Sequence, residues 1–235
     1  MAMKPGSGTR PSRLTVVLAF AGAAAMTVAL IVVALLFRSG GEAPPPPPAP
    51  GVELAGIPQA DRVLGDPAAS VTLIEWADPQ CPGCRYYSEK IFPIVVDDYV
   101  RPGRIKTGFR GYPFLGPDSV KGYRFMLAAG LQDRLWNLQE ALYRNQGAEN
   151  SGWLTDDLVR KLAHGVSGLD VGKLFADAQS DEITQEADAA GGEAEAAGIT
   201  GTPSLFVKVG DTEPYYIQIA TADQMRAALD DALQG

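Results

Sequence analysis

Both cysteines of the 235-residue chain lie in one Cys-x-x-Cys motif, in which Cys81 and Cys84 flank Pro82 and Gly83. Such a pair serves metal binding, a structural disulfide or thiol–disulfide exchange. A structural zinc site needs four ligands as a rule, and the chain offers only one histidine, His164, far along the sequence. A bridge that closes two intervening residues would restrict the unfolded chain very little. Thiol–disulfide exchange is therefore the favoured chemistry, with the other two uses as alternatives.

The residues around the motif predict a strand before it and a helix after it. The run 71–77, Val-Thr-Leu-Ile-Glu-Trp-Ala, is apolar and rich in β-branched residues, and turn-forming residues bound it on both sides. It predicts a buried strand. Apolar side chains then recur at helical spacing from Arg85 to about Val100. Pro82 suits the first turn of this helix, and Pro93 predicts a kink within it.

A thiol at the start of a helix lies beside unpaired backbone N–H groups and the positive end of the helix dipole. Both features lower the pKa of the thiol, and the thiolate is the reactive form. We expect Cys81 to be the exposed cysteine, which exchanges partners. Cys84 follows one turn later and is expected to be shielded by the helix and to resolve the mixed disulfide.

The remaining pattern predicts an α/β domain. The sequence predicts strands at 104–112, 204–209 and 215–219, a mostly helical block at about 118–197, and a closing helix at 223–233. A strand–helix–strand unit implies parallel strands. The short turn between the last two strands implies an antiparallel pair. The expected fold is a mixed sheet with helices on both faces and a helical insertion.

Three segments together resemble one known family. Residues 76–84, Trp-Ala-Asp-Pro-Gln-Cys-Pro-Gly-Cys, resemble the active-site strand and helix of DsbA-like thioredoxin-fold proteins. Residues 200–207, Thr-Gly-Thr-Pro-Ser-Leu-Phe-Val, look like that family's cis-proline loop, and residues 135–146 are similar to a helix of its inserted domain. The resemblance covers about 60–235. It implies a thioredoxin fold with a mixed central sheet and a helical insertion at about 116–197.

The resemblance also implies roles for single residues. Cys81 matches the nucleophile and Cys84 the resolving thiol. Pro203 matches a cis-proline that packs beside the cysteine pair, and Thr202 would offer its backbone to an extended substrate segment. Glu75 matches a buried acid beneath the pair, where a carboxyl could exchange a proton with Cys84.

The implied activity is that of a protein thiol–disulfide oxidoreductase. Its redox centre would be the Cys81–Cys84 disulfide, with no further cofactor and no metal. Its expected partners are exported proteins that carry thiols or disulfides, and a DsbB-like or VKOR-like membrane oxidase that re-oxidises the pair. Disulfide introduction is the expected reaction. Reduction or isomerisation of disulfides is the first alternative, and a non-catalytic binding or chaperone module is the second.

One departure from the family pattern bears on the direction of electron flow. The residues between the cysteines are Pro82 and Gly83, whereas strongly oxidising members often carry Pro-His. Without that histidine the thiolate loses one stabilising group, and a less stable thiolate makes a weaker oxidant. The expected potential lies between those of a strong oxidase and a reductase.

The N-terminal segment predicts a membrane anchor. Residues 14–37 are apolar and uncharged, and a helix of this length crosses a hydrocarbon core of about 30 Å. Basic residues precede the run without any acid among them. The positive-inside rule therefore places residues 1–13 in the cytoplasm and the following domain outside the cell membrane. A cleaved signal peptide is the alternative.

A proline-rich linker at 38–51 is expected to separate the anchor from the domain at 52–235. Consecutive prolines favour a stiff polyproline II spacer. The chain has a formal net charge of −8, although basic residues outnumber acidic ones among the first 51. The negative charge therefore belongs to the domain. It argues against nucleic-acid binding, which requires a basic patch.

Overall fold

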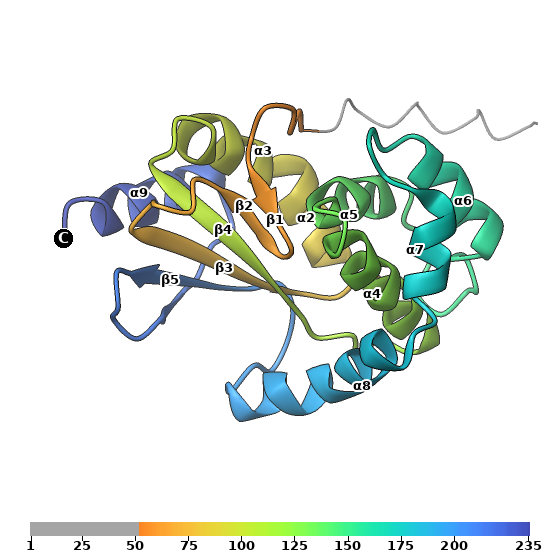
Figure 1. Cartoon of the computed structure of the whole chain (residues 1–235). Helices are drawn as coiled ribbons and strands as arrows, with labels where there is room; N and C mark the ends of the chain where they lie inside the picture. Colours follow the sequence, from red (N-terminus) through yellow and green to blue (C-terminus); the bar gives the residue numbers. More distant parts are fainter. Residues whose placement is uncertain (1–51) are drawn as a thin grey trace, which may run out of the picture. The chain divides into compact units, whose positions relative to one another are not determined.

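The computed structural model describes residues 52–235 (Figure 1). The predicted cytoplasmic segment 1–13, anchor 14–37 and linker 38–51 lie outside the described residues. Within 52–235, no helix combines the length and the hydrophobicity that crossing a bilayer requires.

Residues 52–235 contain a six-stranded mixed sheet, with the strand order β1-β2-β4-β3-β5-β6. The strands are β1 Gln59–Ala60, β2 Val63–Gly65, β3 Val71–Ala77, β4 Ile105–Gly111, β5 Ser204–Val209 and β6 Tyr215–Ile217. β3 and β4 are parallel, and the other neighbouring pairs of this sheet are antiparallel. The predicted mixed sheet is confirmed, as are the parallel pair that follows the first crossover and the antiparallel pair at the end of the chain.

The helix after the cysteine motif is interrupted near its middle, as the sequence predicts. α2 spans Pro82–Lys90, α3 spans Phe92–Val95, and a π-helical turn, η1, spans Val96–Val100. Pro93 lies in the first turn of α3. Because proline has no backbone N–H to donate, the chain ends one helix and starts another at this point.

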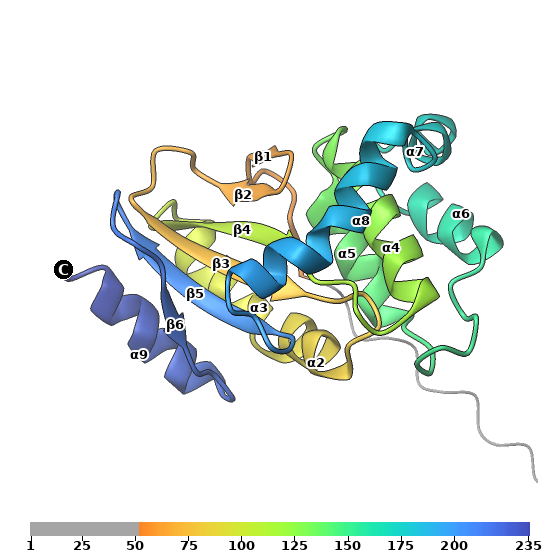
Figure 2. The same cartoon turned by 90° about the horizontal axis from the view of Figure 1, so that it is seen from below.

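The helices between β4 and β5 are α4 Pro117–Gly130, α5 Leu135–Arg144, α6 Asp156–His164, α7 Val171–Asp177 and α8 Asp181–Ala196, and α9 Ala222–Ala232 closes the chain. α8 crosses one face of the sheet, while α3 and α9 lie on the opposite face (Figures 1 and 2). The helical segment between β4 and β5 corresponds to the predicted insertion. It packs at the end of the sheet where β3 leads into the cysteine motif.

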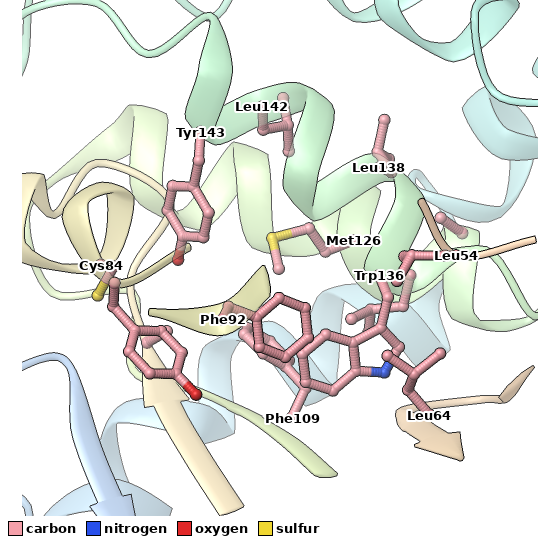
Figure 3. Packing of buried hydrophobic residues seen from close by; sticks show 14 of the residues in the cluster. Leu54, Leu64, Cys84, Phe92, Phe109, Met126, Trp136, Leu138, Leu142 and Tyr143 are labelled. Carbon is pink, nitrogen blue, oxygen red and sulfur yellow. The ribbon is translucent and has the colours of Figure 1, made fainter. Parts of the chain in front are cut away.

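Aromatic side chains join the insertion to the sheet (Figure 3). Trp136 on α5 stacks on Phe92 of α3, with ring centroids 5.2 Å apart. It also meets Phe109 of β4 edge to face at 6.1 Å. The Trp136 indole N–H donates to the carbonyl of Arg62, 3.2 Å away. Aromatic pairs of this kind add about 0.5–1.5 kcal/mol beyond the burial of their surface. The insertion and the sheet therefore share one core.

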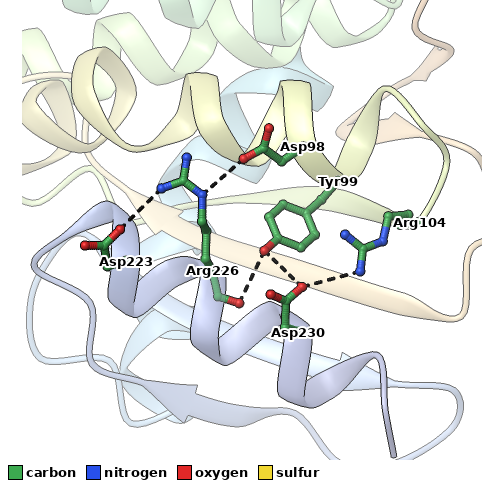
Figure 4. A network of polar contacts seen from close by, with 6 residues as sticks. All are labelled: Asp98, Tyr99, Arg104, Asp223, Arg226 and Asp230. Carbon is green, nitrogen blue, oxygen red and sulfur yellow. Dashed lines mark hydrogen bonds and ion pairs between the residues drawn. The ribbon is translucent and has the colours of Figure 1, made fainter.

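The closing helix α9 is oriented by polar contacts with the chain around η1 (Figure 4). Arg226 forms an ion pair with Asp98 at 3.2 Å. Asp230 accepts a hydrogen bond from the Tyr99 hydroxyl at 3.1 Å and forms an ion pair with Arg104 at 3.3 Å. Exposed ion pairs contribute little stability one by one. Their role here is to fix how α9 lies against the sheet.

Candidate active site

The cysteine motif lies at the junction of β3 and α2. Cys81 is the residue that caps α2, with an extended backbone, and Pro82 opens the helix. The Cys81 sulfur accepts a hydrogen bond from the backbone N–H of Cys84 at 3.3 Å. Both cysteines are free thiols in this structure. The predicted position of the pair at a helix N-terminus is therefore confirmed.

Cys81 is less exposed than the sequence predicts. Its exposed fraction is 6%, against 0% for Cys84. The loop before β5 covers it, and the Cys81 thiol donates to the carbonyl of Thr202 at 3.1 Å. Cys81 remains the more accessible sulfur of the two, and Cys84 is fully shielded as predicted.

The Thr202–Pro203 peptide bond is cis, which confirms the predicted conformation of Pro203. A methyl group added to Gly83 would lie 3.1 Å from the Pro203 ring and 3.6 Å from the Cys81 sulfur. A side chain at position 83 would therefore require the proline ring to shift by a few tenths of an ångström. The loop and the motif thus pack together, although they are separated by more than a hundred residues in the sequence. The role of Thr202 in substrate binding stays a prediction.

The two thiols have opposite acid strengths. The pKa of Cys81 falls from 9.0 to about 6, mainly because the Cys84 thiol hydrogen-bonds to it. Burial opposes this change, while the side chain of Thr202 and the backbone N–H groups of Cys84 and Gly83 assist it. The hydrogen bond to the Thr202 carbonyl is made by the protonated Cys81 thiol. Burial raises the pKa of Cys84 well above its ordinary value, and the neighbouring Cys81 adds to the increase. Cys81 is therefore the thiolate at neutral pH.

Glu75 lies beneath the pair, and its predicted burial is confirmed by an exposed fraction of 1%. Its Oε1 accepts a hydrogen bond from the side-chain amide of Gln139 at 3.3 Å. Its Oε2 has no hydrogen-bond partner among the described residues. Burial raises the pKa of Glu75 to about 8, Gln139 opposes the rise, and the charges of Glu140 and Cys81 add to it. Glu75 is therefore protonated at neutral pH, and its part in proton transfer stays a prediction.

Asp78 is a buried acid in the site that the sequence analysis missed. Four donors surround its carboxylate: the Gln80 N–H at 2.7 Å, the Ser119 hydroxyl at 2.5 Å, and the N–H groups of Phe114 and Leu115 at 2.8 and 3.0 Å. Its backbone carbonyl accepts from the Cys81 N–H at 3.0 Å. Asp78 thus ties the motif to the start of the helical insertion. The sequence feature that could have indicated this role is an acidic residue directly after an apolar strand.

The end of α5 supports the same loop. The Tyr143 hydroxyl donates to the carbonyl of Asp78 at 3.2 Å. The Gln146 side chain donates to the carbonyls of Pro79 and Cys81 at 2.9 and 3.2 Å. Gln139 and Tyr143 lie four residues apart and share one face of α5, whereas Gln146 follows the end of the helix. The spacing of Gln139 and Tyr143 was visible in the sequence.

A metal ion at the cysteine pair would need further ligands besides Cys81 and Cys84. Within residues 52–235, no group of three or more His, Cys, Asp or Glu side chains is arranged to hold a metal ion. His164 is exposed at the end of α6, where its Nδ1 lies 2.7 Å from the carbonyl of Arg160.

Comparison with known proteins gives consistent matches. The family model described as Thioredoxin matches residues 58–231. The probable disulfide bond formation protein D of Bacillus cereus is 27% identical over 174 residues, which cover 73% of this chain and 78% of the relative. The disulfide bond formation protein D of Bacillus subtilis is 24% identical over 179 residues, covering 74% and 77%. The crystal structure of oxidised BdbD from B. subtilis superposes with a TM-score of 0.65 at 22% identity, covering 76% of this chain and 99% of that one.

Proposed function

The chain belongs to the thioredoxin family and is a DsbA-like thiol–disulfide oxidoreductase, and we propose that it introduces disulfide bonds into exported proteins by exchange at Cys81 and Cys84. One observation carries the proposal. The Cys81 sulfur caps α2, accepts a hydrogen bond from the Cys84 N–H at 3.3 Å, and has a pKa lowered to about 6, while Cys84 beside it is fully buried. A reactive thiol and its resolving partner are thus distinguished by their surroundings.

The proposed reaction begins with the oxidised pair. A substrate thiolate attacks the Cys81 sulfur, the Cys81–Cys84 bond breaks, and Cys84 leaves as a thiolate that takes a proton from Glu75. A second substrate thiolate then attacks the substrate sulfur of the mixed disulfide, and Cys81 leaves as a thiolate. The substrate loses two electrons and gains a disulfide, and the cysteine pair gains those electrons. A DsbB-like or VKOR-like membrane oxidase would accept them and restore the disulfide.

The acidity of Cys81 supports oxidation as the direction. A low pKa makes Cys81 a good leaving group and favours the reduced form of the pair, which is the property of an oxidant. The Pro82-Gly83 dipeptide has no histidine to stabilise the thiolate, but Cys84, Thr202 and backbone N–H groups do so in this site. The absence of that histidine favours the alternative activity, which is reduction or isomerisation of disulfides.

We propose further that residues 14–37 anchor the chain in the cell membrane and that residues 38–51 hold the domain away from it on the extracytoplasmic side. The support is the uncharged run of 14–37, the basic residues that precede it, and the proline content of the linker. In this position Cys81 could meet both exported chains and a membrane oxidase.

A refolding experiment tests the proposed reaction. The full-length chain in detergent, oxidised at Cys81 and Cys84, is mixed with a reduced, unfolded protein that has several native disulfides. We expect disulfides to form faster than with the Cys81→Ser variant, and the potential of the pair, measured against glutathione, to lie nearer about −120 mV than about −270 mV. A potential near the lower value, with no gain in disulfides, would instead assign reduction.

A further inference from the structure

The four donors of the buried Asp78 carboxylate come from two parts of the chain. The Gln80 N–H, which donates to Oδ1, belongs to residues 78–81, the cysteine loop. The Ser119 hydroxyl donates to the same oxygen, and the N–H groups of Phe114 and Leu115 donate to Oδ2. These three donors belong to the start of the helical insertion. The carboxylate of Asp78 therefore joins the cysteine loop to the insertion through hydrogen bonds of 2.5 to 3.0 Å.

This arrangement requires a side chain that only accepts hydrogen bonds. Each carboxylate oxygen of Asp78 faces two donors, and the side chain has an exposed fraction of 0%. An asparagine has the same size, but an NH2 group replaces one of the oxygens. That group would face two donors, and these would lose their partner in a buried site, where unpaired polar groups are costly. The acid at position 78 is therefore needed for more than packing.

The Gln80 side chain forms a second link between the same two parts of the chain. It is 1% exposed, and its Nε2 donates to the Leu115 carbonyl and to the Ser119 hydroxyl, at 3.1 Å each. Its Oε1 accepts from the Asn150 N–H at 2.7 Å. Ser119 thus donates to the side chain of Asp78 and accepts from that of Gln80, so both links meet at its hydroxyl.

The backbone of Cys81 is held on both sides by groups outside α2. Its N–H donates to the Asp78 carbonyl at 3.0 Å, and its carbonyl accepts from the Gln146 side chain at 3.2 Å. The Tyr143 hydroxyl in turn donates to the Asp78 carbonyl at 3.2 Å. With the backbone of the capping residue fixed, its sulfur lies 3.3 Å from the Cys84 N–H. Contacts made by the insertion thus determine where the reactive sulfur lies at the start of α2.

We propose that Asp78 is a positioning residue for exchange at Cys81, because its carboxylate fastens the cysteine loop to the insertion and so holds the sulfur beside the N–H groups that begin α2. The inference rests on the proposed function, in which Cys81 leaves as a thiolate. A thiolate that moves away from these N–H groups loses part of their stabilisation. No bond or proton of the exchange passes through Asp78, which acts through the position of Cys81 alone.

Loss of position and loss of charge at Asp78 change the acidity of Cys81 in opposite directions. Removal of a nearby negative charge would by itself favour the thiolate and lower the pKa of Cys81. Displacement of the sulfur from the start of α2 would raise this pKa. The titratable groups that interact with Cys81 are Cys84 on α2, Glu75 on β3 and Tyr143 on α5. Substitutions at Asp78 leave these groups in place, so the direction of the change identifies the role.

The first test is the pH dependence of iodoacetamide labelling at Cys81 in reduced, full-length Asp78→Asn and in the unsubstituted chain. The substitution keeps the size of the side chain and leaves two donors unpaired. We expect the labelling midpoint to rise by about 1 pH unit, because the sulfur loses part of its contact with the N–H groups of α2. A midpoint that falls or stays the same in folded Asp78→Asn overturns the inference.

A milder pair of variants applies the same test if Asp78→Asn does not fold. Ser119→Ala removes one donor of Asp78, and Ser180→Ala removes the hydroxyl that caps α8 through the Ile183 N–H. Both variants delete one serine hydroxyl from the insertion, and both should unfold more easily. The labelling midpoint of Cys81 should rise by about 0.5 pH unit in Ser119→Ala and stay unchanged in Ser180→Ala. Equal midpoints in the two variants would show that the hydrogen bond to Asp78 has a structural role only, and would overturn the inference.

The equilibrium of the cysteine pair with glutathione provides a readout that a merely structural role would not change. A less stable thiolate disfavours the reduced pair. At pH 8 the equilibrium of Asp78→Asn should therefore shift about tenfold toward the disulfide, which corresponds to a potential about 30 mV lower. Ser180→Ala should match the unsubstituted chain. An unmoved equilibrium in Asp78→Asn overturns the inference alone, whereas failure of the unsubstituted chain to form disulfides in a substrate overturns the proposed function.

Discussion

The Cys81→Ser variant is expected to form disulfides in a reduced substrate no faster than the reaction without protein. A serine hydroxyl forms no disulfide, so the variant holds no oxidising equivalent at this position. Cys84 cannot replace Cys81, because its exposed fraction is 0% and its pKa is raised by burial. The measurement is the rate at which native disulfides appear in the refolding substrate.

The Cys84→Ser variant provides the matched control for this loss. With Cys81 still present as a thiolate, it should attack a disulfide-bonded substrate and remain linked to it, since no second thiol can release the chain. Cys81→Ser should yield no such adduct. Trapping by Cys81→Ser at the rate of Cys84→Ser, detected by mass spectrometry, would contradict the assigned roles of the two cysteines.

Reduced protein is expected to gain stability with rising pH through the ionisation of Cys81. The pKa of this thiol is about 6 in the folded chain, against 9.0 for a thiol without these interactions. Between these values the unfolded chain binds the proton that the folded chain has lost, so the free energy of unfolding rises with pH. The contribution is absent below pH 6, complete above pH 9, and at most about 4 kcal/mol. As the pH falls again through 6, the contribution is lost.

The effect is isolated by comparison with Cys81→Ser. Glu75, whose raised pKa of about 8 stabilises the folded chain at low pH, has the opposite pH dependence in both proteins. The difference in free energy of unfolding between the reduced unsubstituted chain and Cys81→Ser, from denaturant titrations with reductant present, should therefore widen from pH 6 to pH 9. A difference that stays constant over this range would show that the thiolate has no special stabilisation.

The central elements of the fold could be predicted because their signals are local. β3 is an apolar, β-branched run between turn residues, and the sequence bounds of 71–77 are those of the structure. The N-terminus of α2 follows from Pro82 and the helix interruption from Pro93. β1 and β2 were not predicted. They have two and three residues, too few for an alternating pattern, and β2 pairs with the distant strand β4 as well as with β1.

The site was predictable where a residue type carries the chemistry. Cys81, Cys84 and the cis bond before Pro203 follow from motifs, and the burial of Glu75 follows from its place in an apolar strand. The low exposure of Cys81 could not be predicted, because it depends on the distance between two loops that are far apart in the sequence. Asp78 was missed for a similar reason, since three of its four donors come from the distant positions 114, 115 and 119.

The pH dependence of Cys81 alkylation measures the central property of the site most directly. The reduced full-length chain is treated with iodoacetamide between pH 4.5 and 10, and the rate of labelling at Cys81 is read by mass spectrometry of the peptide that contains it. The structure leads us to expect a midpoint near pH 6, with Cys84 unlabelled over the same interval. A midpoint near pH 9, the value of an ordinary thiol, would contradict the claim that the start of α2 makes Cys81 the reactive thiolate.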